Sequence, residues 1–175
     1  FTEYHELETS DYFLSWGWTS LNRKVIPVGL LKRKLIKKRN VKKNKLLLII
    51  SGYPRYSGSI LSMPISKQAI DYFEDQTKFF SSLPTSITKN SVIRLYPHDY
   101  KWSQEERWRD LFPESIIDNC EKDFNTALNN SKIVIAGWNT TTYLESLAVN
   151  IPTVIFWNPK YFELRDEAKE YLERI

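Results

Sequence analysis

The sequence contains little cysteine, histidine and glycine, and each shortage argues against a class of site. Its 175 residues include one cysteine, Cys120, so no internal disulfide can form, and a reducing cytoplasm is the expected compartment. The two histidines, His5 and His98, have no metal-ligand spacing with Cys120, so we expect neither a metal site nor a bound cofactor. The five glycines form neither a Gly-x-Gly-x-x-Gly fingerprint nor a P-loop, which disfavours dinucleotide oxidoreductases and P-loop ATPases.

Long hydrophobic runs are also missing. The longest uninterrupted apolar stretch, residues 46–50, is about a quarter of what a transmembrane helix needs. With 42% hydrophobic and 26% charged residues and a mean hydropathy of −0.44, the composition is that of a globular domain with one core. Because the chain begins with Phe1 and stops at Ile175 inside a helical pattern, we expect it to be the C-terminal part of a longer protein.

The positive charge is concentrated in one segment. The chain has 25 lysines and arginines against 21 acids, a net charge of +4, but nine of the bases lie in residues 32–45. Without these nine, 16 bases face 21 acids, which gives −5. Since nucleic-acid binders usually carry their bases on a folded face, no nucleic-acid partner is expected. The tract is interpreted either as a solvated linker or as a peripheral contact with the anionic lipids of the inner membrane.

After residue 45, short apolar runs alternate with segments of helical periodicity. Strands separated by helices of this length imply right-handed crossovers, so the sequence predicts an α/β fold with a Rossmann-like, doubly wound parallel sheet. Ser103 followed by Glu106 has the spacing of a capping box at a helix start. The expected strands are 46–50, 91–96, 115–118, 132–136 and 153–157, and the expected helices are 66–83, 103–112, 122–130, 140–149 and 161–175.

The first 45 residues do not follow this alternation. Residues 12–18 and 25–29 have the composition of extended segments, the second broken by proline and glycine. We therefore interpret residues 1–45 as the tail of a preceding lobe with a basic linker, and residues 46–175 as a separate Rossmann-like domain.

In a parallel sheet, ligands bind beyond the carboxyl ends of the strands, and the loop 137–142 is the most informative of those expected there. It runs from a buried strand directly into a helix, which brings free backbone N–H groups, the hydroxyls of Thr140, Thr141 and Thr142 and the positive end of a helix dipole together. This combination suits a phosphate, and Glu145, one turn further on, could reach the hydroxyls of a ribose. The alternative is that Asn139 or Thr140 simply caps the helix and Glu145, as a first-turn acid, stabilises its dipole.

Two other loops follow expected strands. Arg94 and His98 can both meet phosphate oxygens through charge-assisted hydrogen bonds, although His98 and Asp99 could instead satisfy each other in a capped turn. Gly52, in the loop 51–59, could let a phosphate or an acceptor approach the backbone, or the loop could be merely flexible. Trp138 and Trp157 at strand ends are candidates for stacking on a base or sugar, or for packing in the core.

Residues 131–159 resemble the donor-binding signature of the two-lobed GT-B glycosyltransferases. The shared order is a strand, a threonine-containing loop, the Thr-x-x-Glu of Thr142 to Glu145, a helix of small residues and a strand led by Pro152. The resemblance implies that Glu145 binds the ribose of a nucleotide-sugar donor and that Thr140 to Thr142 hold its diphosphate. It further implies that Arg94 and His98 stabilise the leaving group, and that the catalytic base belongs to the other lobe.

A wider set of segments, 13–18, 94–100, 140–141 with 144–148, and 163–168, is similar to a family of bacterial transferases found with surface-carbohydrate genes. This similarity implies the nucleotide-sugar-binding lobe of a glycosyltransferase in bacterial surface polysaccharide biosynthesis, with a glycan or a lipid-linked acceptor. Two alternatives remain open. One is a nucleotide-sugar 2-epimerase, and the other is a non-catalytic nucleotide- or glycan-binding domain.

Overall fold

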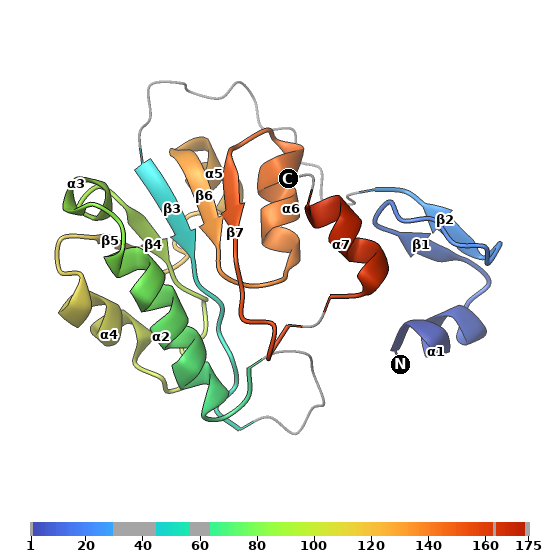
Figure 1. Ribbon diagram of the computed structural model, residues 1–175, viewed down its shortest axis with the longest axis horizontal. Helices are drawn as coiled ribbons and strands as arrows, with labels where there is room; N and C mark the ends of the chain where they lie inside the picture. The colour runs from blue at the N-terminus through green and yellow to red at the C-terminus, as the bar shows by residue number, and fades with distance from the viewer. Residues whose placement is uncertain (1, 30–44, 57–63, 163, 174–175) are drawn as a thin grey trace. The chain divides into compact units, whose positions relative to one another are not determined.

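The computed structural model describes residues 2–29, 45–56, 64–162 and 164–173 (Figure 1). The chain divides into two compact units, Phe1–Leu35 and Ile36–Ile175, which are described separately here. Of the basic tract, only Lys45 lies within the described residues. The end of the predicted loop 51–59 also lies outside them. No helix in the described ranges is both long and apolar enough to cross a membrane.

The N-terminal unit consists of a helix and a small sheet. Helix α1 (Thr2–Thr9) is followed by strands β1 (Phe13–Ser15) and β2 (Val25–Pro27), which pair in parallel with Phe13 opposite Val25. Each of the two segments predicted to be extended therefore contains a strand, although each strand covers only three of the residues. Helix α1 was not expected, because its sequence has no apolar stripe and even Tyr4 is exposed.

A five-stranded parallel sheet forms the C-terminal unit. Its strands are β3 (Lys45–Ile49), β4 (Val92–Arg94), β5 (Ile116–Asp118), β6 (Ser131–Ala136) and β7 (Thr153–Ile155). They lie in the order β5-β4-β3-β6-β7, and every neighbouring pair is parallel (Figure 1). The prediction of an α/β fold with a Rossmann-like parallel sheet is thereby confirmed.

Helices cover both faces of this sheet because successive residues of the central strand point to opposite sides. Leu46 and Leu48 pack with Phe80 and Trp108, which are fully buried side chains of α2 and α4. Leu47 and Ile49 pack on the other face, together with residues of α5. The helices of this unit are α2 (Gln68–Ser81), α3 (Thr85–Thr88), α4 (Gln104–Leu111), α5 (Phe124–Asn129), α6 (Thr141–Ala148) and α7 (Asp166–Leu172).

The expected capping box of α4 is wrong. Ser103 is the N-cap residue, but its φ of 51° is left-handed and its side chain makes no capping hydrogen bond. Asp99 caps the helix instead, because its carboxylate oxygens accept the backbone N–H groups of Ser103 at 2.9 Å and Gln104 at 2.7 Å. The last predicted helix is also shorter than expected, since α7 begins only at Asp166.

Candidate functional site

The strand order reverses on either side of β3, and this reversal defines where a ligand would bind. β3 lies between β4 and β6, and Ile49 is in register with both Arg94 and Ala136. The loops that follow these three strands therefore leave the same edge of the sheet. In doubly wound sheets, ligands occupy the crevice at such a switch point, which here lies between the ends of β3 and β6.

The start of α6 lies at this edge, and no N-cap side chain accepts a hydrogen bond from its backbone N–H groups. Thr140 is the N-cap residue with extended backbone, φ −150° and ψ 171°, and its side chain makes no capping hydrogen bond. The first turn of α6 contains no acid. The N–H groups of the first turn thus keep their capacity to donate, and the helix dipole adds partial positive charge there.

Most polar side chains around this helix start also lack a hydrogen-bond partner in the described part of the chain. Thr141 is exposed, and Thr142 and Glu145 are half-buried. In the part of the chain that the structure describes, the Glu145 carboxylate has no hydrogen-bond or ion-pair partner. Asn139, just before the helix, accepts the Tyr143 hydroxyl at 3.2 Å through Oδ1 and so ties the loop to the helix. The four residues predicted from the motif therefore share one accessible helix start.

Gln76, a residue that sequence reasoning missed, supports the loop before α6. Its side chain is 1% exposed, and its Nε2 donates to the carbonyl oxygen of Gly137 at 3.2 Å. The Gln76 amide lies so close to the Gly137 Cα that a Cβ at position 137 would overlap it. A signal was present in the sequence, because position 76 falls at helical spacing from Ala69, Tyr72 and Phe80, on the buried face of α2.

Gly52 is also placed by packing at the end of β3. A Cβ on Gly52 would overlap the ring of Tyr96, which follows β4. The preceding residue, Ser51, donates its N–H to the Tyr72 hydroxyl at 3.0 Å. Burial raises the pKa of Tyr72 above its ordinary value. These contacts fix the backbone beside the crevice, while a contact of Gly52 with a ligand stays a prediction.

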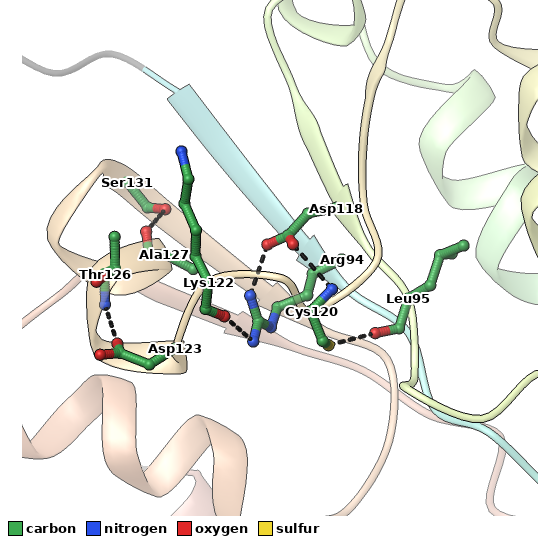
Figure 2. A network of polar contacts seen from close by, with 9 residues as sticks. All are labelled: Arg94, Leu95, Asp118, Cys120, Lys122, Asp123, Thr126, Ala127 and Ser131. Atoms are coloured by element: carbon green, nitrogen blue, oxygen red, sulfur yellow. Dashed lines mark hydrogen bonds and ion pairs between the residues drawn. The ribbon is translucent and has the colours of Figure 1, made fainter.

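Arg94 is engaged in a different network, which Figure 2 shows from close by. Its Nη1 bonds Asp118 Oδ2 at 2.6 Å and its Nη2 donates to the Lys122 carbonyl oxygen at 2.9 Å. Asp118 belongs to β5, whereas α6 follows β6 on the opposite side of β3. The Arg94 guanidinium is thus directed away from the helix start and links β4 to β5. Its contact with a phosphate stays a prediction, and the function proposed below does not depend on it.

His98 lies on the exposed loop after β4. Its ring centroid is 6.2 Å from that of Tyr96 and 6.0 Å from that of Tyr100. In the described residues no hydrogen bond joins His98 to Asp99, whose two carboxylate oxygens cap α4 instead. No described hydrogen bond or ion pair connects His98 to the start of α6, so its role as a leaving-group stabiliser stays a prediction.

Two further observations concern metals and tryptophans. Over the described ranges, no group of three or more His, Cys, Asp and Glu side chains could hold a metal ion. Trp138 and Trp157 are both partly buried against the core that includes α2. The Trp157 ring lies 6.4 Å, centroid to centroid, from Tyr143 of α6, which places it near the helix start.

Comparison with known proteins gives one match. No curated protein and no solved structure matches the chain significantly. The family model described as LIC12162 family transferase matches residues 1–175, which is the whole chain. The chain therefore belongs to the LIC12162 family of transferases.

Proposed function

We propose that this transferase is a glycosyltransferase and that the start of α6 binds a nucleotide-sugar donor. The observation that carries the proposal is an uncapped helix start at the switch point of a parallel sheet, with the unpartnered carboxylate of Glu145 one turn along the helix. Diphosphate oxygens would accept hydrogen bonds from the first-turn N–H groups and from the hydroxyls of Thr140 to Thr142. The Glu145 carboxylate would accept the two hydroxyls of the ribose.

The chemistry that follows is a substitution at the anomeric carbon. An acceptor hydroxyl oxygen forms the new bond to that carbon as the bond to the phosphate oxygen breaks, and the nucleotide departs with the electron pair. The α6 dipole and the N–H groups of its first turn stabilise the negative charge that develops on the departing phosphate. The proton of the acceptor hydroxyl would pass to a base contributed by the other lobe.

The biological setting rests on the similarity of the wider sequence to transferases found with surface-carbohydrate genes. It favours a bacterial surface polysaccharide as the product and a glycan or a lipid-linked sugar as the acceptor. The basic tract at residues 32–45 suits an electrostatic contact with an anionic membrane that carries such an acceptor.

The test is calorimetry with UDP-, GDP-, CMP- and dTDP-sugars on the wild-type chain and on Glu145→Ala. Loss of a charged hydrogen-bond partner should weaken nucleotide binding by about 1 to 3 kcal/mol, or about 5- to 150-fold. Glu74→Ala, which removes an exposed acid from α2, is the matched control and should bind as the wild type does. Absence of nucleotide binding in the wild type, or equal affinity in Glu145→Ala, would contradict the proposal. Interconversion of free nucleotide sugars without an acceptor would favour the epimerase.

A further inference from the structure

A second hollow lies next to the loop that precedes α6. It is a cavity of about 390 Å³ between one face of α2 and the segment that follows β7. Gly137 lines it too, so the cavity shares a residue with the loop that leads into the α6 helix start. Its volume falls in the range of pockets that hold small molecules.

Two residues of the cavity wall, Gln76 and Asp75, each carry an acceptor oxygen without a partner in the described part of the chain. Gln76 is 1% exposed, and its Nε2 is committed to the Gly137 carbonyl, which fixes the orientation of the amide. The Gln76 Oε1 is then buried without a partner, and a buried acceptor of this kind costs free energy unless something donates to it. Asp75 Oδ2 accepts the Asn158 Nδ2 at 3.2 Å, and its other oxygen has no partner in the described part of the chain.

The charge of the cavity is negative. The described residues that line it include the carboxylate of Asp75 and no lysine, arginine or histidine. Asp71, one turn before Asp75 on α2, accepts the Tyr161 hydroxyl at 2.8 Å and keeps a second carboxylate near the cavity. A phosphate would be repelled here, whereas a ligand that carries hydroxyl or amide donors would be attracted.

Aromatic side chains supply the rest of the wall. Phe79 and Phe156 stack with ring centroids 4.6 Å apart and an interplanar angle of 25°. Trp157, beside them, also lies 6.4 Å from Tyr143, whose hydroxyl holds Asn139 at the start of α6. A flat apolar surface next to fixed acceptors suits a ring that is polar at its edge and apolar on its face.

We propose that this cavity binds a neutral sugar ring, whose hydroxyls donate to the Asp75 carboxylate and whose apolar face packs on Trp157. The identification of the ligand as a sugar rests on the proposed function, while the preference for an uncharged hydrogen-bond donor rests on the cavity alone. The ring can belong to the donor, whose diphosphate would lie at α6, or to the acceptor.

The experiment replaces Asp75 by asparagine. This change keeps the size of the side chain and its hydrogen bond to Asn158, but turns the free carboxylate oxygen into an NH₂ donor. Glu74→Gln removes the same charge from the exposed neighbouring position and is the control. Methyl glycosides of glucose, galactose, mannose and N-acetylglucosamine, the nucleotide sugars and the matching nucleoside diphosphates are titrated into the isotope-labelled chain and followed by NMR.

The expected result is that a sugar shifts the side-chain signals of Gln76, Trp157 and Asn158. Asp75→Asn should weaken that sugar about tenfold, and Glu74→Gln should change its affinity less than twofold. If the glycosyl group of the donor occupies the cavity, nucleotide sugars bind more tightly than nucleoside diphosphates, and Asp75→Asn removes the difference. If the acceptor occupies it, methyl glycosides alone show the sensitivity to Asp75→Asn.

The inference and the proposed function fail in different ways. The inference is overturned if no sugar in the panel shifts the three side-chain signals, or if Asp75→Asn binds sugars as tightly as the wild type does. The proposed function fails if no nucleotide binds, even when methyl glycosides occupy the cavity.

Discussion

The ion pair between Arg94 and Asp118 gives the sharpest test of the structural reasoning, because Arg94 is also a predicted phosphate ligand. The side chains of the pair are only 9% and 17% exposed. Arg94→Met keeps most of the apolar volume and removes the charge, so that, within the described residues, Asp118 keeps only the Cys120 N–H, at 2.9 Å, as a hydrogen-bond donor. The guanidinium also lies 5.7 Å from the Phe124 ring centroid, a contact that methionine keeps only through its apolar atoms.

The expected loss of stability is large. Removal of one partner from a buried ion pair leaves the other charge uncompensated and typically costs about 3 to 5 kcal/mol. Because Asp118 is partly exposed, we expect a loss of about 3 kcal/mol here. A domain of this size loses about 10 °C of melting temperature for such a change. Because the measured unit has a total stability of only about 5 to 15 kcal/mol, the difference is easily resolved.

Urea denaturation followed by tryptophan fluorescence measures the free energy of unfolding, since Trp108 is fully buried in the core. The double variant Arg94→Met/Asp118→Leu should recover part of the loss, because no charge is then left without a partner. A coupling of at least about 1 kcal/mol is expected between the two sites. Additive effects, or an Arg94→Met variant that is as stable as the wild type but has lost nucleotide affinity, would refute the structural assignment of Arg94.

Three further predictions test the loops at the carboxyl edge. Gly137→Ala should displace the Gln76 amide and lower the free energy of unfolding by about 2 kcal/mol, and adding Gln76→Ala should restore part of the loss in the same urea assay. Asp99→Ala should cost about 1 to 2 kcal/mol because α4 loses its cap, and it should raise hydrogen exchange in the first turn of that helix. Burial raises the pKa of the Cys120 thiol while Arg94 lowers it, so the rate of alkylation should reach half its maximum at a higher pH than for free cysteine, and higher still in Arg94→Met. An alkylation profile equal to that of free cysteine would contradict this reading of the site.

The central strands of the large sheet were predictable because burial on both faces leaves a simple sequence pattern. The run that became β3 is apolar at almost every position, as expected for a central strand covered on both sides. Pro97 and Pro152 mark where neighbouring segments end or begin. Helices α1 and α3 were missed for the opposite reason, because neither has a buried face that would impose helical periodicity on its sequence.

The site was predictable only in part, because a local pattern does not determine which partner a side chain finds. The loop into α6 is contiguous in sequence, and its residues are necessarily together. Arg94 has the same residue type and strand-end position as a phosphate ligand, but Asp118 of the neighbouring strand, 24 residues later, engages it. The same limit hides Gln76, whose contact with Gly137 spans 61 residues.

The two candidate binding regions have opposite electrostatic character, and this contrast gives them an order. The start of α6 presents N–H groups, hydroxyls and the positive end of a dipole, whereas the cavity presents the carboxylate of Asp75. Gly137 lines the cavity and belongs to the loop that leads into α6, only three residues before Thr140. A molecule with an anionic end and a hydroxylated end, as a nucleotide sugar has, would therefore meet attraction in one orientation and repulsion in the other. Binding in a single orientation would serve the proposed glycosyl transfer, because that reaction requires the anomeric carbon to face the acceptor on every turnover.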